Sequence, residues 1–353
     1  MTNVEVKLNN PYSVVIGSGL FSTLGERVRS VTKAKKVLVV TDSNVSALYL
    51  DSVKSTLHSA GFEVFDFVFM AGENSKTPAT YLDIINCLGS YGFKRTDAIV
   101  ALGGGVVGDI AGFAAATYMR GIDVVQVPTT LLAMIDSSVG GKTGVDLPFG
   151  KNLLGAFWQP KAVIADISTL ETLPEREWET GIGEGIKYAC LAGGRILEIL
   201  LDDIKGNLEE FVRLCVEYKA SVVVEDEKES GLRKLLNLGH TVGHAIEKQS
   251  NFEIPHGVAV ARGVAIMANA AYADGELESA ERDIILSLLT KYGIELLCAS
   301  SDMAEDSNIS EAFAMDKKAE GNGDISAVVI RGLGKCEVRK MSIDQFKEYI
   351  NRA

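Results

Sequence analysis

Three of the four histidines in this 353-residue chain lie between residues 240 and 256. His240 and His244 stand four residues apart in NLGHTVGHAIE, and His256 follows in EIPHGVAV. A spacing of four places two side chains on the same face of a helix, one turn apart. This arrangement suits a metal ion or an anion, so the rest of the chain must indicate which of them it binds.

A metal ion is a chemically sound interpretation, because catalytic zinc takes three protein ligands from histidine and carboxylate and keeps a position for a substrate oxygen. His256 and one histidine of the helical pair could supply the imidazoles. Glu184 in GIGEGIKYA, with Lys187 one turn later, supplies a carboxylate. The pair lacks the glutamate that follows the first histidine in zinc peptidases, since Thr241 stands there, and this disfavours a protease.

The chain has a net charge of −12, so an anionic substrate must be held by a local cluster of cations. Several basic residues lie in segments such as GGKTG and FGKNLLGAF, which we predict to be loops and not amphipathic surface helices. A pocket with a metal ion and many cations suits a small, highly anionic, polyhydroxylated substrate. The candidate cations are Lys142, Lys151, Lys187, Lys219, Arg233, Lys318 and Arg120.

A glycine-rich turn predicts a second ligand. The segment ALGGGVVGDIAGFAAATYMRG runs from an apolar strand through Gly103, Gly104, Gly105 and Gly108 into a helix of small residues. Such glycines let backbone amides approach a pyrophosphate at a helix N-terminus, which indicates a dinucleotide; a plain helix-packing turn is the alternative. The segment DSSVGGKT imitates the end of a P-loop, but Asp136 stands where that motif needs glycine, so we reject ATP hydrolysis.

A second nucleotide signal is TDSNV, which follows an early predicted strand. Doubly wound folds place ribose-binding side chains at this position, and Asp42 and Asn44 are suitable. Capping of a helix N-terminus is an equal alternative, because Asp, Ser and Asn are all good caps.

Strand and helix patterns alternate over the first 170 residues or so, which predicts a parallel sheet covered by helices. The expected strands are 35–42, 62–69, 97–104, 123–129 and 162–166, with 4–8 and 12–17 added as an antiparallel hairpin. Helical patterns then dominate until a small hairpin over 324–341 and a closing helix capped by Ser342. The predicted fold class is therefore α/β, with a Rossmann-like doubly wound domain over 1–174 and a mostly α-helical domain over 175–353. Two such domains normally hold ligands in the cleft between them.

Composition excludes several classes of protein. The chain is 47% apolar and 23% charged, as in ordinary globular proteins, and its acidic balance argues against nucleic acid as a partner. The five cysteines are scattered without a C-x-x-C pair, so we expect neither a disulfide framework nor a thiolate zinc site, and a reducing cytoplasm fits. The N-terminus lacks an apolar or Arg-rich leader and no long apolar run occurs, so we expect neither export nor a membrane span.

Taken together, these motifs resemble the 3-dehydroquinate synthase family of the sugar-phosphate cyclase superfamily, over nearly the whole chain. The segments that carry the resemblance are GGGVVGDIAGFAAATYMRG, VPTTLLAMIDSSVGGKTGVDLPFGKNLLGAFWQP, TLETLPEREWETGIGEGIKYA, DEKESGLRKLLNLGHTVGHAIE, PHGVAVARG and MDKK. No single segment would suffice, but their order and spacing make a chance match improbable.

The resemblance implies two cofactors, NAD in the N-terminal domain and a divalent metal, Zn²⁺ or Co²⁺. The implied NAD-binding residues are Asp42, Asn44, Glu73, Lys76, Gly104, Gly105, Val106, Asp109, Thr129, Thr130, Asp136, Lys142, Lys151, Thr172, Leu173 and Glu177. The implied metal ligands are Glu184, His240 and His256, which leaves His244 as an active-site group beside the metal. The implied substrate-pocket residues are Lys142, Asn152, Lys187, Lys219, Glu229, Arg233, Asn237 and Lys318, with Arg120 entering from a second subunit.

The implied reaction converts 3-deoxy-D-arabino-heptulosonate 7-phosphate to 3-dehydroquinate and phosphate, in the shikimate pathway. A metal-bound substrate hydroxyl loses hydride to NAD, phosphate leaves by β-elimination, NADH returns the hydride, and an intramolecular aldol step closes the carbocycle. The protein would mainly orient the substrate and stabilise enolate-like intermediates. The resemblance also implies a cytoplasmic homodimer that acts as a carbon–oxygen lyase.

Three alternatives stay open. Another sugar-phosphate cyclase would keep the chemistry and change only pocket residues, a metal-dependent polyol dehydrogenase would perform net oxidation, and an NAD-binding module would catalyse nothing. The sequence also departs from the family pattern, since Gly183 and Gly185 flank Glu184 where the family usually has alanine and a β-branched residue. Each glycine should loosen this helix by about 1 kcal/mol relative to alanine. Val258 and Arg262 are further departures, and neither is a proposed ligand.

Overall fold

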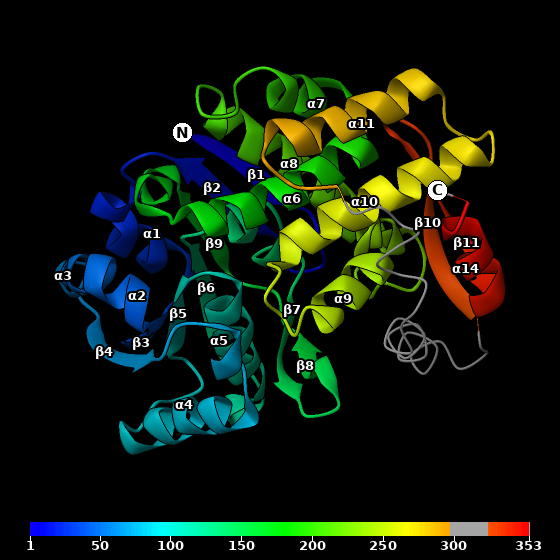
Figure 1. Cartoon of the computed structure of the whole chain (residues 1–353). Coiled ribbons are helices and arrows are strands. Elements are labelled where there is room, and N and C mark those ends of the chain that lie inside the picture. Colours follow the sequence, from blue (N-terminus) through cyan, green and yellow to red (C-terminus); the bar gives the residue numbers. More distant parts are fainter. Residues whose placement is uncertain (297–323, 353) are drawn as a thin grey trace. The chain divides into compact units, whose positions relative to one another are not determined.

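The structure is a computed structural model that describes residues 1–296 and 324–352 (Figure 1). Lys318, a predicted substrate-binding residue, lies outside the described residues. The chain packs as two compact units: unit 1 comprises Met1–Leu173 with Lys219–Val224, and unit 2 comprises Pro174–Tyr218 with Glu225–Ala353. This division differs from the predicted domains, 1–174 and 175–353, because the segment 219–224 packs with unit 1.

Unit 1 contains a seven-stranded sheet in the order β1-β2-β9-β6-β5-β3-β4. Neighbouring strands are parallel except β1 and β2, which form the predicted antiparallel hairpin at one edge. Because β4 lies on one side of β3 and β5 on the other, the chain reverses its direction of winding there, as in doubly wound folds. The strands are β1 (Thr2–Val6), β2 (Tyr12–Gly17), β3 (Lys36–Asp42), β4 (Glu63–Phe69), β5 (Ala98–Gly103), β6 (Asp123–Pro128) and β9 (Ala162–Asp166).

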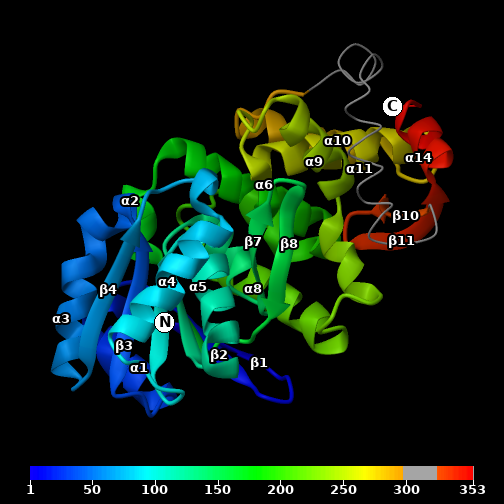
Figure 2. The ribbon, with the colours of Figure 1, turned by 90° about the horizontal axis from the view of Figure 1, so that it is seen from below.

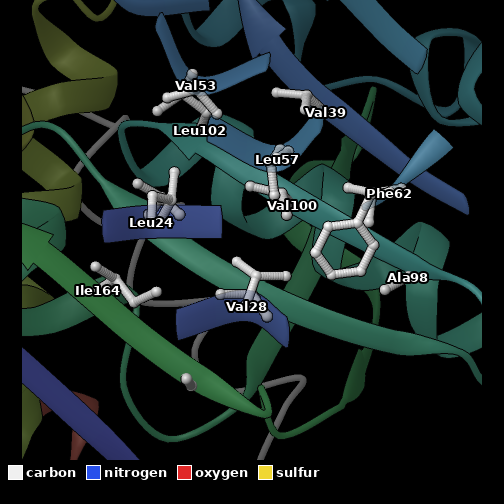
Figure 3. Packing of buried hydrophobic residues seen from close by; sticks show 14 of the residues in the cluster. Leu24, Val28, Val39, Val53, Leu57, Phe62, Ala98, Val100, Leu102 and Ile164 are labelled. Atoms are coloured by element: carbon white, nitrogen blue, oxygen red, sulfur yellow. The ribbon is translucent and has the colours of Figure 1, made fainter. Parts of the chain in front are cut away.

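Successive strand residues point to opposite sides of the sheet, and helices cover the central strands on both sides. On one face Val37 and Val39 pack with helices α1 (Leu24–Val31) and α3 (Asp51–Ser59), as Figure 3 shows for part of this core. On the other face Leu38 and Val40 belong to a second core, which includes residues of α4 (Pro78–Ser90) and α5 (Gly105–Thr117). Each fully buried valine or leucine contributes about 2 kcal/mol. The predicted doubly wound domain is confirmed.

Asp166 ties the end of β9 to the segment that follows β2. Its buried carboxylate accepts hydrogen bonds from the amides of Gly19 and Phe21, both at 2.9 Å, and from the amide and hydroxyl of Ser168. Asp166→Ala leaves these donors without their acceptor, so we expect the free energy of unfolding to fall by about 3 kcal/mol in urea titrations. The exposed Asp83 is the control, and Asp83→Ala should change it by less than about 0.5 kcal/mol. Equal effects of the two substitutions would contradict this role.

The prediction of loops for GGKTG and FGKNLLGAF is wrong, because most of these residues lie in an antiparallel ribbon of β7 (Lys142–Leu147) and β8 (Gly150–Phe157). Lys142 and Lys151 therefore lie on strands. Residues 152–155 of β8 are all exposed. The strand therefore lacks the alternation of buried and exposed residues by which a strand is recognised in a sequence. Asn152 also has a left-handed φ of 56°, which is uncommon outside turns.

Unit 2 is mostly helical in its described part, and α9 and α10 lie side by side in it (Figures 1 and 2). The helical pattern of this region is interrupted between α7 and α8, over residues 202–207. The helices are α6 (Glu175–Ala192), α7 (Gly194–Leu201), α8 (Leu208–Glu225), α9 (His240–Gln249), α10 (His256–Ala273) and α11 (Ser279–Lys291). Residues 219–224 of α8 are those that pack with unit 1.

The C-terminal hairpin and helix of unit 2 form as predicted. Strand β10 (Asp324–Gly332) pairs with β11 (Lys335–Ser342), and α14 (Ile343–Ile350) follows, all in red in Figure 2. Ser342 caps α14 through its side chain, and Gln345 completes a capping box. No helix in the described residues is long and apolar enough to cross a membrane.

Candidate metal and nucleotide sites

Unit 2 brings together the three predicted metal ligands, Glu184, His240 and His256. One ligand atom from each residue lies within 4.8 Å of the others. Glu184 Oε1 is 3.2 Å from Nε2 of His256 and 3.6 Å from Nε2 of His240. Glu184 comes from the middle of α6, whereas each histidine is the first residue of its helix, α9 or α10.

Glycines at the crossing of α6 and α10 explain how these side chains meet. A Cβ added to Gly183 would lie 1.9 Å from the carbonyl oxygen of Gly257, and one on Gly257 would lie 1.8 Å from that of Thr180. The backbones of α6 and α10 are therefore in direct contact. Gly183 is next to Glu184 in the chain, and Gly257 is next to His256. The cost predicted for glycines in α6 is thus offset by close helix packing, and a Cβ on Gly185 would similarly lie 2.8 Å from the ring of Phe211.

Each imidazole is oriented through its other nitrogen. Nδ1 of His240 lies 3.2 Å from the carbonyl oxygen of Leu238, and Nδ1 of His256 lies 3.0 Å from Oε2 of Glu247. Because a carbonyl or carboxylate oxygen only accepts, Nδ1 is the donor in both contacts. Nε2 of both rings therefore lies on the side of Glu184, where it can bind a metal once it carries no proton.

The two histidines have opposite proton affinities. Burial lowers the pKa of His240 to about 3, helped by the positive charge of Lys187 and opposed by Glu184. Burial alone would also lower the pKa of His256, but hydrogen bonds and charges of Glu184 and Glu247 outweigh it and raise this pKa to about 9. Without a metal, His240 is therefore neutral and His256 protonated at neutral pH.

A buried cation accompanies the three ligands. Nζ of Lys187 is 2.6 Å from Oε2 of Glu184, and both side chains are at most 2% exposed. The donor set of one carboxylate and two imidazoles fits a catalytic zinc or cobalt site, since it can leave a position for a substrate oxygen. His244 is exposed on α9, with its ring 5.5 Å from that of His240 and 5.9 Å from that of His256.

Three predicted substrate-binding residues lie on the segment that precedes α9. Nδ2 of Asn237 donates to Oε1 of Glu229 at 3.0 Å. Arg233 is 1% exposed, and its Nη1 donates to the carbonyl oxygen of Glu227 at 2.5 Å. The 3₁₀-helix over Leu232–Asn237 carries both Arg233 and Asn237 and ends three residues before His240. The segment therefore connects these polar residues, along the chain, to the predicted metal ligand His240.

Asp226, which is not among the predicted site residues, organises this segment. Its carboxylate accepts hydrogen bonds from the amides of Ser230, Gly231 and Arg233 and from the Ser230 hydroxyl. Burial alone would raise the pKa of Asp226, but these hydrogen bonds lower it to about 2. The loop that Asp226 closes contains Glu229 in a left-handed conformation, with a φ of 59°. An aspartate followed by Ser-Gly four residues later was the available signal.

In unit 1, Asp42 ends β3 and Gly104 follows the adjacent strand β5, where the winding of the sheet reverses. Ligands of doubly wound folds bind at this position. The capping alternative for Asp42 is confirmed, because its Oδ1 accepts from the amides of Asn44 at 2.8 Å and Val45 at 3.0 Å. Binding of a ribose by Asp42 and Asn44 stays a prediction.

The glycine-rich turn lies against the end of β6. The amide of Thr129 donates to the Gly103 carbonyl at 3.0 Å, and a Cβ on Gly104 would lie 3.1 Å from Cγ2 of Thr130. Gly105 and Val106 begin α5. The packing alternative explains Gly108, since a Cβ there would lie 2.8 Å from Gln126.

Five further residues of the predicted sites form one cluster in unit 1. Nζ of Lys76 lies 2.7 Å from Oδ2 of Asp109 and donates to Oδ1 of Asn152 at 2.6 Å, while Glu73 Oε1 is 3.8 Å from Nζ of Lys151. Burial raises the pKa of Asp109 despite Lys76. Burial also raises the pKa of Glu73 against the two lysines. This cluster joins predicted cofactor residues to a predicted substrate residue.

Lys219 and Asp136 were assigned to different ligands, but they are partners in unit 1. Nζ of Lys219 donates to the backbone carbonyl of Asp136 at 2.6 Å and pairs with its carboxylate. The remaining predicted residues lie on other elements: Lys142 begins β7, Thr172 contacts the hydroxyl of Tyr49 at 2.5 Å, Leu173 ends the segment 1–173 of unit 1, Glu177 lies on α6 in unit 2, and Arg120 is exposed with a φ of 65°.

Sequence comparison decides the family. A model described as 3-dehydroquinate synthase N-terminal matches residues 66–180, and one described as 3-dehydroquinate synthase C-terminal matches residues 181–319. The 3-dehydroquinate synthase of Clostridium acetobutylicum is 39% identical over 357 residues, which cover 99% of both chains. The chain belongs to the 3-dehydroquinate synthase family. The predicted resemblance is confirmed, and the protein is a member of a family of enzymes.

Two solved structures of other sugar-phosphate cyclases have the same fold as this chain. A 2-deoxy-scyllo-inosose synthase complexed with carbaglucose-6-phosphate, NAD⁺ and Co²⁺ matches 99% of both chains with a TM-score of 0.85 and 28% identity. The 2-epi-5-epi-valiolone synthase of Streptomyces hygroscopicus, with NAD⁺ and Zn²⁺ bound, covers 96% of this chain and 94% of its own, with a TM-score of 0.84 and 26% identity. Their cofactors are those predicted here.

Proposed function

We propose that this protein converts 3-deoxy-D-arabino-heptulosonate 7-phosphate to 3-dehydroquinate and phosphate, with NAD and Zn²⁺ or Co²⁺ as cofactors. The observation that carries the proposal is the convergence of Glu184, His240 and His256 in a chain of this family. The fold and the two cyclase structures with bound NAD⁺ and metal support it. The cytoplasmic location, the homodimer and the place in the shikimate pathway belong to the same proposal.

The two units supply different parts of the chemistry. When bound, the metal would polarise the substrate hydroxyl, and NAD would take up a hydride and return it, so that no net oxidation occurs. Glu184, His240 and His256 would hold the metal, while Lys187 keeps positive charge beside the carboxylate of Glu184. The NAD-binding residues would include those at the ends of β3, β5 and β6 and the cluster around Lys76, together with Asp136, Lys142, Thr172, Leu173 and Glu177.

The substrate is anionic and polyhydroxylated, so its binding needs fixed cations and amides. Arg233 and Asn237 are held by Glu227 and Glu229, which lowers the entropy lost when they bind a carboxylate or hydroxyl. His244 presents an exposed imidazole that can donate a hydrogen bond to substrate oxygen or exchange a proton with it. Lys142, Asn152, Lys219, Arg120 and Lys318 are proposed to complete the binding of substrate.

The proposal is tested by measuring phosphate release from 3-deoxy-D-arabino-heptulosonate 7-phosphate with NAD and Zn²⁺ while absorbance at the NADH band is recorded. We expect phosphate to accumulate over many turnovers without accumulation of NADH, and a chelator to stop the release. NADH accumulation with a polyol would instead support a dehydrogenase. Phosphate release from glucose 6-phosphate but not from the heptulosonate would support another cyclase.

Asp226 should affect this activity through the segment that it closes. In Asp226→Asn an NH₂ group replaces one carboxylate oxygen and faces backbone N–H groups that are also donors. These contacts become repulsive, so Glu229 and Arg233 are displaced. We expect kcat/KM for phosphate release to fall about tenfold, with zinc affinity unchanged. The exposed Asp202 is the control, and Asp202→Asn should retain full activity. Wild-type kinetics of Asp226→Asn would disprove the positioning role.

A further inference from the structure

A second carboxylate, that of Glu247, contacts the metal-ligand candidate His256. Glu247 lies near the end of α9 and is only 2% exposed. The proposed reaction assigns it no role. A buried carboxylate is retained at a cost in desolvation unless its hydrogen bonds offset that cost, so its contacts must explain its position.

His256 lies between two carboxylates that approach opposite nitrogens of its ring. Oε1 of Glu184 is 3.2 Å from Nε2, and Oε2 of Glu247 is 3.0 Å from Nδ1. The contact with Glu247 fixes both the plane of the ring and the nitrogen that carries the proton. Metal-bound histidines generally donate their other N–H to a carboxylate or carbonyl in this way.

Glu247 also holds the loop that delivers His256 to α10. Its backbone carbonyl accepts a hydrogen bond from the amide of Phe252 at 2.8 Å. Asn251 and Phe252 both have left-handed φ angles, of 50° and 64°, and the hydroxyl of Ser250 accepts from the amide of Ile254. The reversal of the chain is therefore anchored on the same residue that orients the ring.

We propose that Glu247 is a positioning residue of the metal site: it accepts the Nδ1 proton of His256 and thereby directs the Nε2 lone pair to the cation shared with Glu184 and His240. This inference rests on the proposed function only in assuming that these residues bind a metal. His240 is oriented differently, by the backbone carbonyl of Leu238. Glu247 is thus a side chain whose substitution can change the orientation of the His256 ring without removing a ligand.

A competing arrangement uses the same residues. Ligand atoms of His244, Glu247 and His256 also lie within 4.8 Å of one another, so they could hold a second metal ion. If that ion used Nδ1 of His256, the hydrogen bond to Glu247 would have to break, and a buried carboxylate would have to bind metal beside an exposed imidazole. The positioning role keeps the contact that the structure shows. The number of metal ions bound per chain distinguishes this role from a second metal site.

The test compares Glu247→Gln with Glu253→Gln in the full-length chain. Glutamine keeps the shape of Glu247 but can donate to Nδ1 or accept from it, so the tautomer of His256 is no longer specified. Glu253 is an exposed glutamate three residues before His256, so it controls for the loss of one negative charge. Zinc affinity is measured by competition with a chromogenic chelator, cobalt geometry by visible absorption, and folding by thermal melting of the metal-free proteins.

We expect Glu247→Gln to bind zinc about 10- to 100-fold more weakly than the wild type, with an altered cobalt spectrum and an unchanged affinity for NAD. Glu253→Gln should match the wild type in zinc affinity and in metal-free melting temperature. Metal-free Glu247→Gln should melt at a lower temperature, because it loses the charge that pairs with the protonated His256, so zinc affinities are compared where the variant is folded. Wild-type zinc affinity in a folded Glu247→Gln would overturn the inference and leave the proposed function intact. A second zinc ion per chain that is lost in Glu247→Gln would also overturn it. Absence of zinc binding by the wild type would overturn both.

Discussion

Glu184→Gln is expected to lower the rate of phosphate release by about a thousandfold, since several kcal/mol of metal-dependent stabilisation are lost with the ligand. The amide keeps the shape of the carboxylate but not its charge, so zinc affinity should fall together with the rate. The measurement is initial-rate phosphate release at saturating NAD, with zinc content determined on the same sample. Glu175→Gln, an exposed change on the same helix, is the control and should leave both quantities unchanged.

The substitution also removes the negative charge next to the buried ammonium of Lys187, 2.6 Å away. Breaking a buried ion pair by removing one partner typically costs about 3–5 kcal/mol, so the metal-free variant should melt at a lower temperature. Rates are therefore compared where circular dichroism shows the variant to be folded. A folded Glu184→Gln protein that retains wild-type activity with wild-type zinc content would contradict the assigned ligand set.

The affinity for zinc is expected to fall about a hundredfold when the pH is lowered from 8 to 6. The raised pKa of His256, about 9, means that its imidazole is protonated over this range and must lose one proton before it binds metal. The lowered pKa of His240, about 3, means that it is already neutral and releases none. Affinity should thus fall about tenfold for each pH unit below 9, and the loss should be absent well above pH 9.

Two measurements check this pH dependence. Competition titrations with a chelator, corrected for the chelator's own protonation, give the slope of affinity against pH. Calorimetry in buffers of different ionisation enthalpy counts the protons released per zinc ion. A slope near one and release of about one proton are expected. A slope near two would mean that both histidines are protonated in the metal-free protein, and a flat profile would mean that neither is.

The sequence predicted the fold of unit 1 because its strands are continuous β-branched runs such as KVLVVTD, separated by helical patterns. The central strands β3 and β5 are buried on both faces, so their runs are mostly apolar. The β7–β8 ribbon escaped prediction because exposure of residues 152–155 removes the alternation of buried and exposed positions. Composition could not reveal that residues 219–224 pack with unit 1, since this depends on tertiary contacts alone.

The site was predictable only in part, for a related reason. The types of the metal ligands and the family resemblance pointed to Glu184, His240 and His256, whose convergence depends on helix contacts far apart in the chain. The glycine contact between Gly183 and Gly257 cannot be read from either segment alone, and Gly183 was interpreted as a cost. Glu247 was missed because a glutamate in a helix is ordinarily a solvent-exposed charge.

The central claim is that one carboxylate and two imidazoles hold a single catalytic cation. The most direct test is anomalous X-ray scattering at the zinc absorption edge, recorded from crystals of the zinc-loaded protein. The account predicts one anomalous peak per chain, about 2.0–2.2 Å from an oxygen of Glu184 and from Nε2 of His240 and of His256. A peak coordinated by other residues, with these three side chains outside bonding distance of it, would contradict the account.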